Sequence, residues 1–330
     1  MKRHSIGIIA NPQSGRDIRR LVAHASVFDN EEKVNIVERL LATWNTMGLD
    51  SVLFMPDSYN IVYRAAERIR KLGIELKQLD MKPIFTDSDT QKAASLMQGN
   101  VDAIVVIGGD GTNRAAVKGL DPKNSTPIVS ISTGTNNVFP IMVEATIAGL
   151  AAWVLTSEEI DQTLITNQEK FLKLSWEGGE DLALIDVAFT KERFVGSRAV
   201  WDPKSISAVF CSRARPENVG FSSLLGFLHP SGQYDPYGSY AILDSPGDWV
   251  WFPMAPGKIE RVEVKEYGLL HKDEPFILSL DDGTIALDGE REIEVFLPTK
   301  FSVELSCEGP LTVDIPKALE MGAQRGLFKP

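Results

Sequence analysis

The chain has 330 residues, of which 43% are hydrophobic and 24% are charged, the composition of an ordinary folded protein with room for two domains. Its 34 basic and 45 acidic residues give a net charge of −11. This balance argues against nonspecific binding to nucleic acid and against an anionic membrane surface.

The two cysteines and four histidines are too scattered to form a zinc cluster of the usual spacing. A reducing, cytoplasmic compartment is the simplest setting for so few cysteines. Only about five apolar residues precede Asn11-Pro12, which is too short for a signal peptide, and no apolar run approaches a membrane span. We therefore expect a cytoplasmic protein without stable membrane association and without a nucleic-acid partner.

The first 155 residues alternate predicted strands with predicted helices. Apolar runs predict strands at 6–10, 51–55, 83–86, 101–107 and 127–132. Apolar stripes at helical spacing predict helices at 29–48, 61–73, 89–98, 113–120 and 141–155. This alternation is typical of a parallel sheet with helices on both faces, and such sheets bind ligands at the carboxyl ends of their strands.

From residue 156 the pattern changes to short strands separated by turn residues, which predicts an antiparallel β-sandwich over 156–314. Residues 170–176 and 182–190 are expected to pair as a hairpin. Further strands are expected at 207–211, 240–243, 249–252, 259–265, 276–280, 284–287, 292–296, 302–306 and 311–313. The last segment, 315–330, is expected to contain a short helix that returns to the first domain.

The most informative segment is Gly108-Gly109-Asp110-Gly111-Thr112, directly after the strand 101–107. Glycines let a phosphate approach the backbone, and the N–H groups of the next helix's first turn attract an anion. Because a carboxylate repels phosphate, Asp110 suggests a chemical role, such as taking a proton or holding a metal ion. A plain tight turn is the alternative. Neither a P-loop nor a dinucleotide fingerprint is present.

Three other segments place polar residues at turns. Asn11–Arg16 follows the first strand and offers small polar groups and an arginine, which fits either a phosphate contact or a plain turn. Ser132–Asn137 follows a later strand, and its hydroxyls and amides could bind phosphate or ribose oxygens or form an ordinary turn. Asp288-Gly289 by itself is typical of a hairpin turn.

Taken in order, these segments resemble the superfamily that unites NAD kinases with diacylglycerol and other lipid kinases. The signature of that superfamily is similar to Gly108–Thr112, and its other elements are similar to Asn11–Gly15, Gly134–Asn137 and Asp288-Gly289. The whole run most resembles the acetoin-catabolism X proteins. This resemblance implies an NAD kinase-like fold, with a Rossmann-like parallel-sheet α/β domain followed by an antiparallel β-sandwich.

The resemblance also implies a kinase that uses ATP or polyphosphate and Mg²⁺ to phosphorylate a hydroxyl of a small molecule. Asp110 would be the catalytic base. The donor phosphates would be bound by Asn11, Ser14, Gly15, Arg16, Gly108, Gly109, Gly111, Thr112, Thr133, Gly134 and Thr135. The acceptor would be bound by Asn136, Asn137, Asp186 and Asp288. The metal ligands stay unassigned.

The acceptor stays open because the sequence departs from both branches. Ile185-Asp186 stands where NAD kinases have an Asn-Glu or Asn-Asp pair, and Arg114-Ala115 stands where lipid kinases have Asn-Glu. Conversion of NAD to NADP is the first expectation. The alternatives are another small alcohol, a sugar-like or lipid acceptor (with 221–228 as the one apolar patch for membranes), or a non-catalytic nucleotide sensor linked to acetoin catabolism. We also expect a homo-oligomer, either a dimer or a tetramer.

Overall fold

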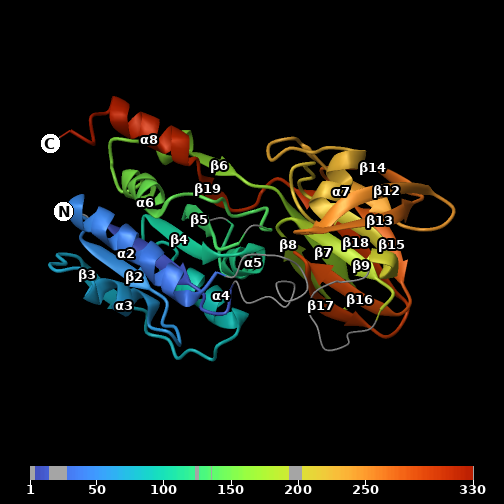
Figure 1. Cartoon of the computed structure of the whole chain (residues 1–330), viewed down its shortest axis with the longest axis horizontal. Helices are drawn as coiled ribbons and strands as arrows, with labels where there is room; N and C mark the ends of the chain where they lie inside the picture. The colour runs from blue at the N-terminus through green and yellow to red at the C-terminus, as the bar shows by residue number, and fades with distance from the viewer. Residues whose placement is uncertain (1–3, 15–27, 123–125, 135, 193–202, 330) are drawn as a thin grey trace.

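The computed structural model describes residues 4–14, 28–122, 126–134, 136–192 and 203–329, and the side chains of 291 and 292 are left out. The chain forms a parallel-sheet half and a β half that lie side by side (Figure 1). The first contains a seven-stranded sheet in the order β3-β2-β1-β4-β5-β19-β6. Its strands are β1 (Ser5–Ala10), β2 (Ser51–Phe54), β3 (Glu75–Gln78), β4 (Ala103–Gly108), β5 (Ile128–Ser132), β6 (Thr166–Gln168) and β19 (Leu311–Val313).

Helices cover both faces of this sheet because successive side chains of each strand point to opposite faces. Ile6 and Ile8 of β1 face one core, whereas Ile9 faces the other. The first core contains residues of α2 (Asn30–Thr46), α3 (Ile61–Glu67), α6 (Ala145–Val154) and α8 (Ile315–Gln324). The second contains residues of α4 (Asp87–Met97) and α5 (Asp110–Lys118).

The strand order places a topological switch point between β1 and β4. The chain runs outward from β1 through β2 to β3, and then returns to β4 on the other side of β1. The loops that follow β1 and β4 therefore diverge to opposite faces, and ligands of open α/β sheets bind at this divergence. The turns at Asn11 and at Gly108 stand at this point.

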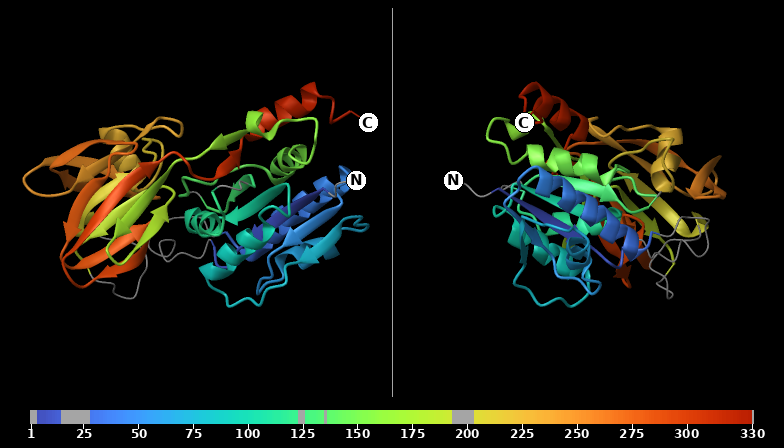
Figure 2. Two further views of the ribbon diagram at one scale, coloured as in Figure 1. Left: turned by 180° about the vertical axis from the view of Figure 1, so that it is seen from behind. Right: turned by 60° about the vertical axis from the view of Figure 1, so that its left-hand side comes forward.

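The β half contains two larger sheets and one hairpin (Figures 1 and 2). A six-stranded sheet has the order β14-β11-β10-β9-β16-β17, a four-stranded sheet has the order β15-β18-β7-β8, and β12 pairs with β13. Leu174, Phe210 and Phe301 belong to the apolar core that the two larger sheets share. The expected fold class, an α/β domain followed by antiparallel β structure, is confirmed.

The strands of the β half are short and antiparallel. They are β7 (Phe171–Trp176), β8 (Gly179–Ala183), β9 (Asp186–Thr190), β10 (Ile206–Cys211), β11 (Tyr237–Ile242), β12 (Asp248–Ala255), β13 (Lys258–Val264), β14 (Glu266–His271), β15 (Phe276–Leu280), β16 (Gly283–Leu287), β17 (Glu290–Val295) and β18 (Thr299–Ser306). The helix α7 (Phe221–Leu228) packs against β12 and β10, so most of the apolar patch at 221–228 is buried.

Several sequence predictions need correction. Residues 83–86 form no strand, because the Asp89 carboxylate accepts the N–H groups of Ile84 and Phe85 at the entry to α4. The strand in that region is β3, a short edge strand with little apolar signal. The expected helix at 141–155 begins only at Ala145, where Glu144 accepts the N–H groups of Thr146 and Ile147.

Two segments expected in the β-sandwich belong to the parallel sheet instead. β19 pairs with β5 in parallel and with β6 in antiparallel orientation. The residues 182–190, expected to form one strand that pairs with 170–176, are divided between β8 and β9. Only β8 pairs with β7, whereas β9 pairs with β10 and β16. After β19 the chain continues into α8, which Asp314 caps by accepting the Lys317 N–H and which packs on α6. Within the described residues, no helix has the length and apolar character needed to cross a membrane.

Candidate functional site

The glycine turn joins β4 to α5, and neighbouring side chains lie directly on it. A Cβ added at Gly108 would lie 2.5 Å from the Cβ of Thr112. A Cβ added at Gly109 would lie 2.9 Å from the Asn137 Oδ1. A side chain at Gly108 would clash with Thr112, and one at Gly109 would require the Asn137 side chain to move. The first two glycines therefore make room for Thr112 and Asn137, in addition to exposing the N–H groups at the start of α5.

Asp110 is the first residue of α5 and is half-buried. Its carboxylate accepts the N–H of Phe139 at 2.8 Å and the N–H of Val138 at 3.1 Å. These two residues follow the polar turn Ser132–Asn137, so Asp110 fixes that turn relative to the glycine turn. The carboxylate is thus held in place by hydrogen bonds from neutral backbone donors.

The first polar turn is attached to the glycine turn by a side-chain contact. The Asn11 Oδ1 accepts the N–H of Gln13 at 2.9 Å, and the Asn11 Nδ2 donates to the Thr112 Oγ1 at 3.3 Å. The Ser14 hydroxyl donates to the Asn11 carbonyl at 2.8 Å. The structure therefore brings Asn11 to the glycine turn, and Ser14 is bonded to Asn11. Gly15 and Arg16 lie outside the described residues.

Lys33 holds this turn and was not expected at the site from the sequence. It comes from α2, it is fully buried, and its ammonium donates to the carbonyls of Asn11 at 2.8 Å and Ser14 at 2.6 Å. The Asn30 side chain accepts from it at 3.1 Å. The signal was present in the sequence, because Lys33 falls on the apolar stripe of this helix, four residues before Val37. A lysine at a core position calls for a specific partner.

The polar turn Ser132–Asn137 lies beside the same glycines. The Thr133 N–H donates to the Gly108 carbonyl at 3.3 Å. The Ser132 hydroxyl donates to the Gly134 carbonyl at 2.7 Å, and the Asn137 Nδ2 donates to the Ser132 Oγ at 2.8 Å. Asn137 is thus engaged in holding the turn, and Asn136 is half-buried beside it. Thr135 lies outside the described residues.

Asp288 is enclosed by protein at the tip of the β16–β17 hairpin. Its φ of +51° and the φ of +79° at Gly289 form the mirror-image turn that Asp-Gly favours. Its carboxylate accepts the N–H groups of Leu184, Ile185 and Asp186 at 3.0, 2.7 and 3.2 Å. Burial raises the pKa of this carboxyl, whereas a nearby arginine and these three N–H groups act to lower it. Asp288 therefore holds the β8–β9 turn.

Arg114 links this hairpin to the helix of the glycine turn. The guanidinium lies between two carboxylates of the β half, with its Nε 3.6 Å from the Asp288 Oδ2 and its Nη1 3.8 Å from the Asp181 Oδ1. Asp181 also binds the Lys118 ammonium at 2.7 Å. Both basic residues come from α5, so α5 is joined to the β half by charge as well as by packing.

Asp186, expected at the acceptor, lies next to the Asp288 carboxylate. Its N–H donates to that carboxylate, its carbonyl accepts the Asp288 N–H at 2.9 Å, and the residue is half-buried. Cys211 pairs with it across the sheet. Burial, together with the charges of Asp186 and Asp288, raises the pKa of the Cys211 thiol well above its usual range. The thiol is therefore unreactive at neutral pH.

Glu290 brings a second carboxylate to the glycine turn. A Cβ added at Gly111 would lie 3.2 Å from the Glu290 Oε1. Glu290 was not among the residues expected at the site from the sequence. The signal was its position directly after an Asp-Gly hairpin tip. The structure thus places the Glu290 carboxylate against the third glycine, the residue that follows Asp110 in the chain.

A buried ion pair supports the segment that Asp110 holds. The guanidinium carbon of Arg213 lies 5.3 Å from the centre of the Phe139 ring. Arg213 donates to the Glu169 carboxylate at 2.6 Å, and Gln233 and Thr312 donate to the same carboxylate. Glu169 stands between β6 and β7, so this cluster ties Phe139 to the crossing between the two halves.

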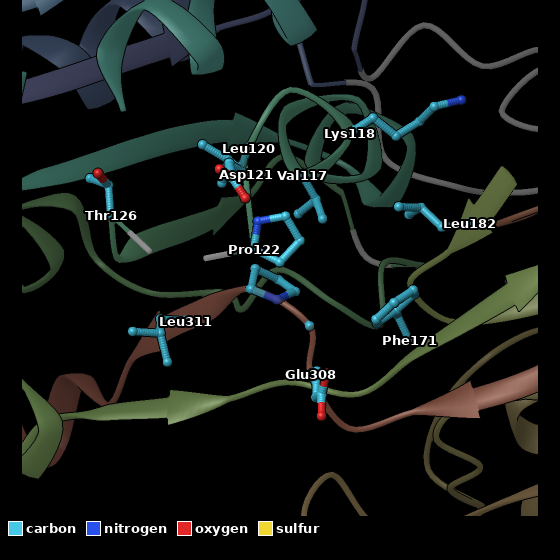
Figure 3. Close-up of a pocket in the computed structure, with 12 residues that line it drawn as sticks. Val117, Lys118, Leu120, Asp121, Pro122, Thr126, Phe171, Leu182, Glu308 and Leu311 are labelled. Carbon is cyan, nitrogen blue, oxygen red and sulfur yellow. The ribbon is translucent and has the colours of Figure 1, made fainter. Parts of the chain in front are cut away.

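A cavity of about 120 Å³ lies at the other end of α5 from the glycine turn (Figure 3). Its lining is mostly apolar and includes Val117, Leu120, Pro122, Phe171, Leu182 and Leu311. None of the expected site residues lines it. Among the described residues, no group of three or more His, Cys, Asp or Glu side chains is arranged to hold a metal ion.

Comparisons with known proteins cover nearly the whole chain. Residues 6–160 match the model of the ATP-NAD kinase N-terminal domain, and residues 170–308 match that of the acetoin catabolism protein X C-terminal domain. The acetoin catabolism protein X of Cupriavidus necator is 36% identical over 98% of this chain and 94% of its own length. An uncharacterized protein of Archaeoglobus fulgidus is 41% identical over 22% of this chain and 23% of its own length.

Among solved structures, yeast NADH kinase complexed with NADH matches 100% of this chain and 89% of its own chain. Its TM-score is 0.51 and its sequence identity is 10%. At this identity the match shows a shared fold alone. The identity to the Cupriavidus necator protein, over almost the full length of both chains, shows the family. The first half of the chain matches the NAD kinase N-terminal domain and the β half matches the acetoin catabolism protein X C-terminal domain. The chain belongs to the acetoin catabolism protein X family.

Proposed function

We propose that the chain is an ATP-dependent kinase that transfers a phosphoryl group to a hydroxyl of a small molecule, with NAD as the first acceptor to test. The proposal rests on one observation. The polar turns at 11–14 and 132–137 and the glycine turn at 108–112 meet at the β1–β4 switch point, beside the partly exposed Asp110. Open α/β sheets bind their ligands at such a point. The NAD kinase-like domain match supports the reaction class.

The donor phosphates would lie against the glycine turn and the start of α5. Thr112 and the first N–H groups of α5 would bind them, and the helix dipole favours their negative charge. The fully buried Lys33 ammonium adds a fixed positive charge beside Asn11, although its hydrogen bonds go to protein oxygens. The geometry thus offers both neutral donors and positive charge to an anion.

Asp110 would orient the acceptor hydroxyl and take its proton, and the Glu290 carboxylate lies near Gly111. Mg²⁺ binds to one or two carboxylates together with substrate phosphates, and Asp110 and Glu290 would be its protein ligands. When bound, the ion would neutralise charge on the transferred phosphoryl group. The acceptor-binding roles of Asn136, Asn137, Asp186 and Asp288 remain part of the proposal.

The test is to incubate the protein with NAD, Mg²⁺ and either ATP or polyphosphate, and to measure NADP formation. If no NADP forms, labelled ATP is offered with a panel of small alcohols, sugars and lipids. NADP formation supports NAD as acceptor. A labelled product from another alcohol replaces the acceptor and keeps the kinase. A protein that binds no nucleotide contradicts the whole proposal.

A second candidate function is a non-catalytic nucleotide sensor. The observation that favours it is that both oxygens of the Asp110 carboxylate already accept backbone N–H groups. In such a protein the same turns would bind ATP or NAD without chemistry. Tight binding of either nucleotide, measured by calorimetry, with no transfer to any acceptor would support this function over the kinase.

A further inference from the structure

The β12–β13 hairpin has one buried face and one exposed aromatic face. It lies at the end of the β half away from the parallel sheet (Figures 1 and 2). Phe252, Val262 and Val264 point into the core that α7 covers. On the opposite face, Trp249 is 53% exposed, and Trp251 and Ile259 are each 60% exposed. Among the described strands, β12 and β13 pair only with each other.

Arg261 lies between the two tryptophans on this exposed face. It is the cross-strand partner of Trp251. Its guanidinium carbon lies 4.6 Å from the centre of the Trp249 ring and 5.6 Å from that of Trp251. It makes no ion pair with any side chain that the structure describes. The stacking holds the guanidinium in one place, with its charge available to a carboxylate from outside.

The same face carries a carboxylate of its own. Glu263 stands two residues beyond Arg261 on β13, opposite Trp249. One oxygen of this carboxylate accepts from the Ser245 hydroxyl at 3.1 Å and from the Gly247 N–H at 2.8 Å, which fixes the side chain. The exposed face therefore presents one fixed cation and one fixed anion beside two tryptophans.

We propose that this face is the contact surface between two copies of the chain. In a twofold dimer the same patch meets itself, so Arg261 of each copy would contact Glu263 of the other. The patch is balanced in charge, whereas the whole chain has a net charge of −11, which would repel an anionic membrane. Tryptophan and arginine at the centre of a patch are the residues that contribute most to binding.

The first experiment measures the association of the full chain by sedimentation over a range of concentrations. The wild type is expected to dimerise, and Trp251→Ser is expected to raise the dimer dissociation constant at least about tenfold. Ile277→Ser is the matched control, because Ile277 is 58% exposed on β15, in another sheet. Thermal unfolding of each variant checks that it folds. A monomeric wild type, or a Trp251→Ser variant that dimerises as the wild type does, overturns the proposal.

The second experiment tests the charge pairing. Arg261→Glu and Glu263→Arg should each weaken dimerisation, because like charges would then meet across the twofold axis. Mixing the two variants should restore dimers, since every cross-pair in the mixed dimer joins opposite charges. Failure to associate on mixing overturns the pairing. Co-sedimentation of a monomeric wild type with phosphatidylglycerol vesicles, lost in Trp251→Ser, would make the face a membrane-binding surface instead. Neither experiment depends on the proposed function.

Discussion

Two Asp-Gly pairs, one in each half of the molecule, use their carboxylates for the same kind of contact in different surroundings. Asp110 starts a helix, is half-buried, and accepts the N–H groups of Val138 and Phe139. Asp288 sits at a hairpin tip, is buried, and accepts three N–H groups while facing Arg114. The dipeptide alone does not decide between a site residue and a structural one. Exposure and the presence of a buried counter-charge do.

The comparison implies a division of roles between the halves. The parallel-sheet half supplies the turns that would bind the phosphates. The β half supplies buried charges that hold the β8–β9 turn against α5 and bring Glu290 to Gly111. Substitutions in the turns of the parallel-sheet half should therefore affect turnover. Substitutions of the buried charges of the β half should affect stability.

The largest effect is expected from Asp110→Asn. If Asp110 is the general base, turnover should fall roughly 10²–10⁴-fold, because an amide cannot take the proton. The free energy of unfolding should change little, since the amide oxygen can still accept the N–H of Phe139. Phosphoryl transfer and urea unfolding are measured together, with the exposed Asp281→Asn as control. Unchanged turnover in Asp110→Asn would mean that Asp110 only holds the backbone of residues 138 and 139.

The second largest effect is expected from Asp288→Ala, on the free energy of unfolding. It leaves three N–H groups without their acceptor and removes one of the two carboxylates beside the buried Arg114, at a cost of about 3–5 kcal/mol in unfolding free energy. Asp281→Ala should stay within about 0.5 kcal/mol of the wild type. Combining Asp288→Ala with Arg114→Met should cost less than the sum of the two single changes. Strict additivity in this cycle would contradict a direct link between α5 and the hairpin.

The smallest effect concerns a buried cation of the β half. The Lys170 ammonium donates to the carbonyls of Gly232 and Tyr237, and burial lowers its pKa to about 8. Between about pH 8 and its ordinary pKa of 10.5, the unfolded chain binds more protons than the folded one. Stability should therefore rise with pH in this window relative to Lys170→Met.

Urea unfolding of both proteins at several pH values from 7 to about 10 checks this. The free energy of unfolding of the wild type should rise relative to that of Lys170→Met as the pH rises above about 8. A constant difference would show that Lys170 keeps its ordinary pKa.

The sequence predicted the order of the main strands and helices and the turns that meet at the switch point, because apolar period and glycine position are local signals. It did not predict β3 or the place of β19. β3 is a weakly apolar edge strand, and β19 has three residues whose partners lie far away in the chain. Lys33 and Glu290 were also missed, since their importance depends on contacts with Asn11 and Gly111.

The sequence by itself determined the fold class and the presence of a glycine turn with one carboxylate, because these follow from local backbone geometry and apolar period. Only the tertiary structure decided which atoms that carboxylate contacts and which other carboxylate lies near the glycine turn. It also decided that Asp288 is enclosed while Asp110 stays partly exposed. The physical reason is that burial and hydrogen bonding are set by segments distant in the chain, here residues 138–139 for Asp110 and 184–186 for Asp288.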